Sequence, residues 1–296
     1  MTCAFARVRQ PGAGRANLGI MAVSQRAESG LQAGAARRDD RIQSPADLRG
    51  QIRAGDFRRT TAGHCPVYHQ ANLVVLPAAG AAEFAAFCSR NPKPCPVLEI
   101  LPPGEYAPGR CATGADLRTD VPGYRVYREG RLAEKRHDLR QIWRDDFVSF
   151  LLGCSFTFEH ALAEAGLPLR HVEQGTTVPM FRSSIQCLPA GSYQGPMVVT
   201  FRPMPAERLS DVLTLSARYP LAHGSPVHVG DPAEIGIRDL GRPDYGDPVQ
   251  LRPGEVPVFW ACGVTPQAAA LKSAPELMIT HEPGFMFVTD LPRELS

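Results

Sequence analysis

The segment 153–159, GCSFTFE, places a thiol, a hydroxyl and a carboxylate where one predicted helix ends and another begins. Thiolates at helix starts are activated, so Cys154 is a candidate nucleophile that would form a thioester intermediate. Glu159, buried beside two phenylalanines, would have a raised pKa and is the leading candidate for a general acid or base. The alternatives are a capping or ion-paired glutamate and a cysteine that only packs between helices.

A second pair of polar residues, His228 and Asp231, lies at the end of the expected strand 227–229. Ligands commonly bind at the carboxyl end of a parallel strand. There His228 can shuttle a proton and Asp231 can orient a substrate amine. The alternative for Asp231 is a plain helix cap.

Substrate contacts are predicted from side chains that can hold carboxylates. Arg182 and Arg118 are candidates for a carboxylate clamp because a guanidinium presents forked donors, although each can also be structural. Gln70 and Asn72 can donate to substrate oxygens, or can satisfy the backbone of their own loop. Two helix starts, which favour anions, complete the predicted substrate-binding set with Ser155, Cys262 and Thr265.

These residues depend on helices that the apolar pattern predicts. Apolar residues at helical spacing over 139–151 predict a helix that leads into the break at Gly153. A second helix, capped by Ser155, then continues to Gly166. In the last quarter of the chain, Thr265 is expected to cap another helix.

The order of the remaining elements predicts the fold class. Strand 73–76, helix 80–90 and strand 97–101 follow one another in the order typical of a parallel crossover. We therefore predict an α/β fold with a mixed, largely parallel sheet flanked by helices, and leave open a smaller α+β subdomain. No tandem repeat is visible. Further strands are predicted over 169–172, 178–182, 197–202, 256–261, 277–280 and 285–289, with a helix over 206–218.

Composition separates the first residues from the rest. Residues 1–40 are rich in arginine, glycine and alanine, which is typical of a transit peptide or of a mis-assigned start codon, and little order is expected there. Residues 41–296 are predicted to form the α/β catalytic unit. The smaller subdomain, if present, would be inserted within about 156–225.

The bulk numbers exclude several classes of protein. A formal net charge of +2 gives no reason to expect nucleic acid as a partner. The eight cysteines show no metal-type spacing, so we predict reduced thiols, a cytoplasmic location and no cofactor. A divalent metal held by distant loops is not excluded. No apolar run is long enough for a membrane helix, so no membrane partner is expected. The expected partner is a small-molecule substrate, and a homo-oligomer is left open.

Several long motifs in the sequence resemble a known family. The chain is similar to the D-glutamate cyclase family, whose bacterial members are usually called hydro-lyases. The resemblance covers about 41–296, with one departure at His69 in the loop before the first strand. The matching stretches include QANLVVLP (70–77), WRDDFVSFLLGCSFTFE (143–159), VPMFRSSIQC (178–187), HGSPVHVGDP (223–232) and PGEVPVFWACGVTPQAA (253–269).

The resemblance implies an α/β enzyme that removes water from D-glutamate to give 5-oxo-D-proline. Cyclisation requires a deprotonated amine, an electrophilic carboxyl group and a proton for the leaving oxygen. Glu159, His228, Asp231 and Cys154 are the predicted catalytic residues. Dehydration of another hydroxy acid and non-catalytic binding of glutamate or 5-oxoproline are the alternatives.

Overall fold

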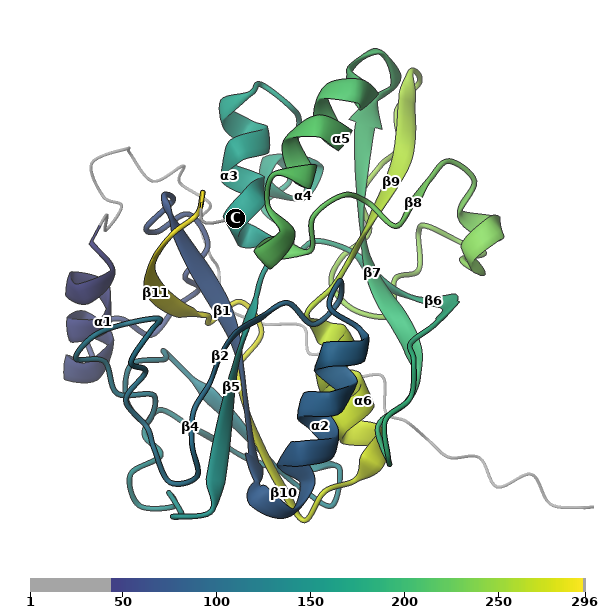
Figure 1. Ribbon diagram of the computed structural model, residues 1–296. Helices are drawn as coiled ribbons and strands as arrows, with labels where there is room; N and C mark the ends of the chain where they lie inside the picture. Colours follow the sequence, from purple (N-terminus) through teal and green to yellow (C-terminus); the bar gives the residue numbers. More distant parts are fainter. Residues whose placement is uncertain (1–43, 295–296) are drawn as a thin grey trace, which may run out of the picture. The chain divides into compact units, whose positions relative to one another are not determined.

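The computed structural model describes residues 44–294, which contain two antiparallel sheets (Figure 1). The first sheet has the order β2-β5-β1-β10-β3-β4, with β11 pairing beside β10 on the same strand β1. Its strands are β1 (Tyr68–Pro77), β2 (Val97–Ile100), β3 (Tyr124–Arg128), β4 (Arg131–Arg136), β5 (Phe147–Gly153), β10 (Leu277–His281) and β11 (Phe287–Pro292). The second sheet has the order β6-β7-β9-β8, from β6 (Met180–Gln186), β7 (Pro196–Pro205), β8 (His228–Val229) and β9 (Glu255–Ala261).

The prediction of a largely parallel sheet is wrong, because every strand pairing within 44–294 is antiparallel. The predicted crossover does connect two strands that run in the same direction, β1 and β2. However, β5 enters the sheet between them and pairs antiparallel with both. Local sequence cannot show this insertion, since β5 arrives only after the hairpin β3–β4.

The helix predicted over 139–151 is also wrong, because its second half is the central strand β5. All seven residues of β5 are buried. A strand buried on both faces reads as a continuous apolar run, which periodicity alone cannot separate from a buried helix. The predicted strand 169–172 is likewise a short helix, α4 (Arg170–Glu173).

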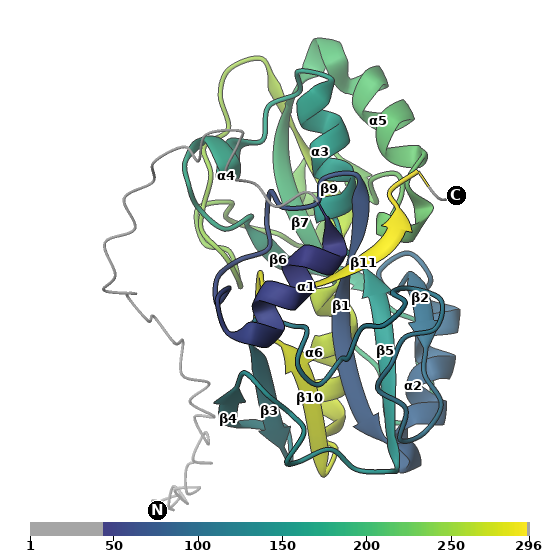
Figure 2. The same ribbon diagram turned by 90° about the vertical axis from the view of Figure 1, so that its left-hand side faces the viewer.

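Helices cover one face of each sheet. On the first sheet, α2 (Ala78–Arg90) and α6 (Val264–Ser273) lie side by side and share one apolar core with the strands (Figure 1). On the second sheet, α3 (Phe156–Glu164) and α5 (Leu209–Ala217) share a core with β7 and β9. Figure 2 shows α1 (Pro45–Ala54) alongside β11.

The chain crosses between the two sheets at two points. Helix α3 follows directly from β5 of the first sheet, yet it packs on the second sheet. Helix α6 follows directly from β9 of the second sheet, yet it packs on the first. We call the segment 154–157, which includes the start of α3, the first crossing, and the segment 262–265, which includes the start of α6, the second crossing.

The strands that lead to the two crossings repeat one arrangement. Strands β1 and β7 each have 10 residues, and β5 and β9 each have 7. The last residue of β5 pairs with the fourth residue of β1, and the last residue of β9 pairs with the fourth residue of β7. Strand order also agrees, since β2-β5-β1 corresponds to β8-β9-β7.

Hydrogen bonds at the crossings repeat as well. Thr157 accepts a hydrogen bond from the backbone N–H of Gln70 at 3.4 Å, and Thr265 accepts one from the N–H of Val198 at 3.0 Å. Both acceptors lie three residues after a cysteine, and both donors are the third residue of their strand. The two halves share few identical residues, which is why no repeat is visible in the sequence.

One equivalent position differs sharply between the two halves. Leu76, Phe150 and Leu152 of the first sheet correspond to apolar residues of the second, namely Met204, Val258 and Trp260. Val74, however, corresponds to Arg202, which is fully buried. The second sheet therefore has a cation where the first has a valine.

The structure describes only part of the chain that the domain prediction covers. Residues 1–40 lie outside the described residues. The strands of the second sheet span 180–261, so they extend beyond the interval 156–225 that we gave for a subdomain. Whether that sheet is a subdomain stays a prediction.

Candidate functional site

Glu159 lies in the first turn of α3, just after the first crossing, with 8% of its surface exposed. Its Oε1 atom accepts hydrogen bonds from Nε of Arg202 at 3.2 Å and from Nη2 of the same side chain. The Nε2 atom of His171 lies 3.4 Å from Oε1. Within residues 44–294, no hydrogen bond reaches the other carboxylate oxygen, Oε2. One oxygen is thus fixed and the other is free.

The charges around Glu159 decide its protonation state. Burial alone raises the pKa of Glu159, but the charge of Arg202, the charge of His171 and hydrogen bonds from both outweigh burial and lower the pKa to about 2. The prediction of a raised pKa is therefore wrong. A carboxylate with this pKa stays ionised at neutral pH, so it suits an anchor for a cation better than a general acid or base.

Arg202 makes hydrogen bonds and aromatic contacts in addition to its pair with Glu159. Its Nη1 donates to Oγ1 of Thr200 at 2.7 Å and its Nη2 donates to Oγ of Ser155 at 3.1 Å. Its guanidinium carbon lies 5.2 Å from the ring centre of Phe158 and 5.5 Å from that of Trp260. Ser155 occupies the N-cap position of α3 without capping it, since its hydroxyl accepts from Arg202 instead.

His171 is presented by α4, next to the buried Arg170. Arg170 donates to Glu173 at 3.1 Å and to Glu255 at the start of β9. These contacts fix α4 against the second sheet and hold His171 beside Glu159.

Sequence reasoning missed both Arg202 and His171. A lone arginine at the end of an apolar strand segment was the available signal, since a charge is rarely buried without a partner.

Two thiols lie at the two crossings. Burial raises the pKa of Cys154 to about 12 and that of Cys262 to about 11. Backbone N–H groups of Phe156 and Val264 donate to the respective sulfur atoms, the second at 3.5 Å, but they do not offset burial. The prediction that a helix start activates Cys154 is therefore wrong, because desolvation outweighs the helix start.

The predicted N-cap of α6 is also wrong. Gly263 takes the N-cap position, and Thr265 lies inside the helix rather than capping it. The Thr265 hydroxyl bonds to both backbone groups of Val198, at 3.0 Å and 3.1 Å.

Asn72 connects the two crossings. Its Nδ2 donates to the carbonyl oxygens of Gly153 at 2.9 Å and Leu152 at 3.4 Å. A methyl group placed on Gly263 would lie 2.3 Å from this Nδ2 atom, so the amide occupies the space that the glycine leaves. The structure thus brings together five predicted residues with Arg202 and His171. The five are Glu159, Cys154, Ser155, Cys262 and Asn72.

Comparison with known proteins assigns a family to this arrangement. The chain is 55% identical over 251 residues to a "Putative hydro-lyase" of Stutzerimonas stutzeri (strain A1501), covering 85% of this chain and 95% of that protein. A Geobacillus kaustophilus protein with the same type of name is 53% identical over 251 residues, with the same coverage. One from Rubrobacter xylanophilus is 57% identical over 245 residues, covering 83% of this chain and 95% of the relative. The model of the D-glutamate cyclase family matches residues 148–290.

The chain belongs to the D-glutamate cyclase family. It is a hydro-lyase, an enzyme of the carbon–oxygen lyase class. The matched range 148–290 begins in β5 and includes both crossings. A crystal structure of a nitrogen repressor-like protein from Methanococcus jannaschii aligns with 80% of this chain and 92% of that chain at 10% identity. Its TM-score of 0.35 is too low to support any argument.

The pair His228 and Asp231 lies apart from the site in this family member. His228 is on β8, an antiparallel edge strand, so the predicted parallel strand end does not exist. Its Nε2 contacts the backbone oxygen of Asp231 at 2.8 Å, not the carboxylate. The Asp231 carboxylate accepts from the N–H of Ala233 at 2.9 Å and caps a 3-10 turn, Pro232–Ile235. Within residues 44–294, no hydrogen bond or ion pair connects this pair to Glu159, and its catalytic role stays a prediction.

The two predicted clamp arginines are also engaged elsewhere. Arg182 is exposed on the edge strand β6, and its Nη2 donates to the hydroxyl of Tyr245 at 2.8 Å. Arg118 pairs with Asp116 at 2.8 Å, and its guanidinium carbon lies 3.3 Å from the ring centre of Tyr106. The structural alternative therefore accounts for the contacts of both.

Gln70 is buried and bonds to the loop that precedes β1. Its Oε1 accepts from Thr61 at 2.8 Å, and its Nε2 donates to the carbonyl oxygens of Thr61 and His64. These bonds match the alternative in which Gln70 satisfies its own loop.

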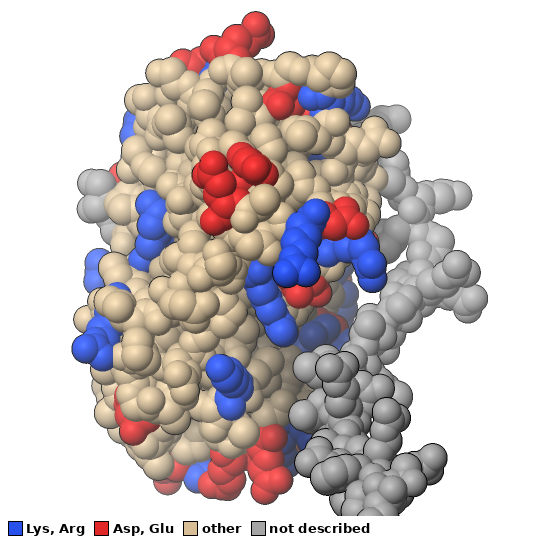
Figure 3. All heavy atoms as spheres, turned by 90° about the vertical axis from the view of Figure 1, so that its right-hand side faces the viewer, with Lys and Arg blue, Asp and Glu red and all other residues tan. Residues whose placement is uncertain are grey.

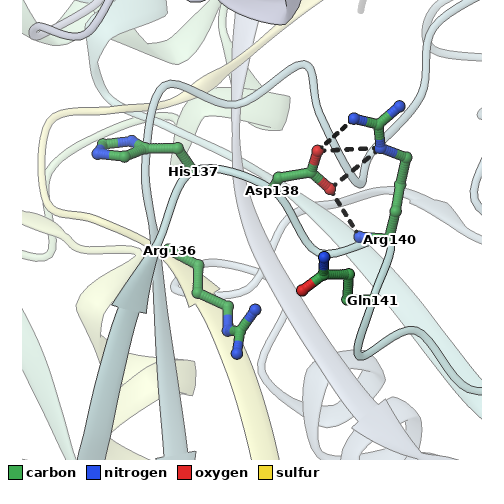
Figure 4. Close-up of a pocket in the computed structure, with 5 residues that line it drawn as sticks. All are labelled: Arg136, His137, Asp138, Arg140 and Gln141. Atoms are coloured by element: carbon green, nitrogen blue, oxygen red, sulfur yellow. Dashed lines mark hydrogen bonds and ion pairs between the residues drawn. The ribbon is translucent and has the colours of Figure 1, made fainter.

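Surface features add no further member to the site. A cavity of about 460 Å³ lies beyond the end of β4 (Figure 4). Two of its charged lining residues, Arg140 and Asp138, form an ion pair at 2.5 Å. On the face drawn in Figure 3, acidic and basic side chains are interspersed with wide uncharged areas. Within the part of the chain that the structure describes, no helix has the length and apolarity to cross a membrane, and no group of three metal-ligating side chains forms.

Proposed function

We propose that this hydro-lyase removes water from a small amino acid at the cluster of Glu159, Arg202 and His171, with D-glutamate giving 5-oxo-D-proline. The observation that carries the proposal is the buried carboxylate of Glu159, which is ionised and has one oxygen free. Family membership supports the loss of water, and the family description supports glutamate.

The fold itself does not require this ion pair. At the equivalent positions of the other half, Val74, which is buried in the apolar core, replaces Arg202, and the half-buried Gln267 replaces Glu159, so that half forms without the ion pair. Replacing a buried ion pair by apolar residues is often neutral or stabilising, by about 1–4 kcal/mol. Retention of the pair in one half only therefore points to a role in the reaction.

The free Oε2 atom suits an ammonium group. An ionised, largely desolvated carboxylate forms a strong, charge-assisted hydrogen bond with a cation, whereas a neutral hydroxyl gains much less. This favours an amino acid over a hydroxy acid as substrate. In this proposal the substrate nitrogen lies beside Glu159, next to the neighbouring His171.

The reaction has a simple atomic balance. The nitrogen of D-glutamate forms a bond to the γ-carboxyl carbon, and one C–O bond of that carboxylate breaks. Two protons leave the ammonium group and join the departing oxygen as water, so the net charge is unchanged. Because Nε2 of His171 faces Glu159, we propose that the other ring nitrogen of the neutral imidazole, Nδ1, takes a proton from the substrate nitrogen. Holding the bent substrate supplies proximity.

Chiral product analysis tests the proposal. The protein would be incubated separately with D-glutamate, L-glutamate and a hydroxy acid of equal length. Formation of 5-oxoproline from glutamate, and of the unsaturated acid or lactone from the hydroxy acid, would be measured above the spontaneous rates. We expect product from D-glutamate alone. Glu159→Gln should strongly slow its formation, while Glu164→Gln, the same change at an exposed position of α3, should not. Turnover of the hydroxy acid without turnover of D-glutamate would refute the proposal.

A further inference from the structure

The second crossing carries polar groups that the proposed reaction has not yet used. Asn72 is only 5% exposed, and no hydrogen bond from residues 44–294 reaches its Oδ1 atom. Its amide lies against Gly263, at the beginning of α6. The Oδ1 atom is not among the fully buried side-chain atoms of residues 44–294 that lack a partner, so this acceptor is open to a small ligand.

Asn72 also shows that the two crossings touch. The same amide bonds to Gly153, which directly precedes Cys154, and abuts Gly263, which directly follows Cys262. Both thiols lie close enough to Glu159 and Arg202 for these charges to affect the thiol pKa, and Cys262 also affects the pKa of Cys154. The free oxygens of Asn72 and Glu159 therefore belong to one region where the two halves of the protein meet.

The two crossings differ in charge. The first has Glu159 with Arg202, and the second has Gln267 with Val74 at the equivalent positions. The substrate of the proposed reaction differs between its ends in the same way. Its amino-acid end stays charged throughout, but its γ-carboxylate becomes an uncharged lactam.

We propose that the substrate spans both crossings, with its ammonium group at Glu159 and its reacting carboxyl group at the second crossing, in contact with Asn72 and Cys262. The inference rests on the proposed function and assigns the orientation of the substrate within that site.

Neutral surroundings at the second crossing assist the reaction. Low polarity around a carboxylate favours its protonated form, which is a better electrophile than the anion. The thiol of Cys262 stays protonated and donates a hydrogen bond to the carboxyl oxygen. The Asn72 Oδ1 atom accepts a hydrogen bond from the carboxyl O–H before the reaction and from the lactam N–H after it. No covalent step through sulfur is required.

A matched pair of cysteine variants tests the contact. Cys262 and Cys187 are 7% and 6% exposed, and burial raises the pKa of each thiol to about 11, but Cys187 lies in the core beside α2. Cys262→Ala should lower kcat/KM for D-glutamate and weaken binding of 5-oxo-D-proline about three- to tenfold, the effect of one lost hydrogen bond. Cys187→Ala should leave both values unchanged. Thermal unfolding of both variants controls for stability.

A second variant tests the need for a neutral site. Asn72→Asp keeps the shape of the side chain but places a negative charge at the second crossing. It should raise the KM for D-glutamate and weaken 5-oxo-D-proline binding about tenfold or more, because two carboxylates would then face each other. Asn72→Ala should show a smaller effect on both.

The outcomes separate the two proposals. If the parent protein turns over D-glutamate but Cys262→Ala behaves like Cys187→Ala and Asn72→Asp like Asn72→Ala, the orientation is refuted and the proposed function stands. If the parent protein binds 5-oxo-D-proline with the expected sensitivity to Cys262 and Asn72 but shows no turnover, the orientation stands and the proposed function fails. If it neither turns over D-glutamate nor binds the product, both are overturned.

Discussion

The double variant Arg202→Val/Glu159→Gln copies the neutral pair Val74 and Gln267 into the other half of the protein. We expect it to fold as stably as the parent protein and to turn over D-glutamate much more slowly. Arg202→Val alone should be much less stable, because it leaves the Glu159 carboxylate buried without its main partner. Removing one partner of a buried ion pair typically destabilises a protein by about 3–5 kcal/mol.

The structure gives a similar magnitude. The pKa of Glu159 falls from 4.5 to about 2, and about 1.4 kcal/mol corresponds to each pH unit. The surroundings therefore favour the ionised form by about 3 kcal/mol, which the single variant would lose. The double variant removes both charges together and should recover most of this loss.

Urea and thermal unfolding would measure stability, and production of 5-oxoproline from D-glutamate would measure turnover. Loss of a charge-assisted hydrogen bond to the substrate should lower kcat/KM by about 10- to 100-fold. Glu164→Gln, which removes one partner of an exposed ion pair with Arg293, serves as the control and should change stability by less than about 1 kcal/mol. A double variant as unstable as Arg202→Val would show that the fold needs the ion pair, which would refute our reason for assigning it to the reaction.

Three further predictions concern acid stability, packing and thiol reactivity. Because the Glu159 pKa is lowered on folding, its contribution to stability is complete above pH 4.5 and is lost as the pH falls towards 2, so acid unfolding should be less steep in the double variant. Gly263→Ala should lower stability by about 1–3 kcal/mol and impair turnover, since its methyl group would displace Asn72, whereas Gly50→Ala in α1 has open space and should stabilise by about 0.5–1 kcal/mol. Cys154 should react with iodoacetamide very slowly at pH 7, because burial raises its pKa to about 12; rapid alkylation would contradict a neutral thiol.

Local sequence was sufficient for those parts of the site that adjoin one another in the chain. Helix α3 begins after Ser155 and ends before Gly166, close to the predicted bounds, although the expected cap by the Ser155 side chain does not form. Cys154 and Glu159 lie at its start, and Cys262 lies at the start of α6. These features follow from turn chemistry and short-range periodicity, which depend on neighbours in the sequence.

The pKa of Glu159 could not be predicted from its neighbours in the sequence. The sequence shows that Glu159 is flanked by phenylalanines, and burial alone would raise its pKa. The sign reverses because Arg202 of β7 and His171 of α4 meet the carboxylate in the folded chain. A pKa is set by the charges nearest in space, and here both come from other elements of the second half.

The sequence by itself determined the family, the chemical type of the residues at both crossings and most of the helices and strands that carry them. Only the tertiary structure decided that the sheets are antiparallel, that β5 enters between β1 and β2, and that the chain crosses twice between the sheets. The reason is physical. Strand order and the meeting of two crossings depend on the burial of apolar faces distant in the chain, and neither periodicity nor local propensity contains that information.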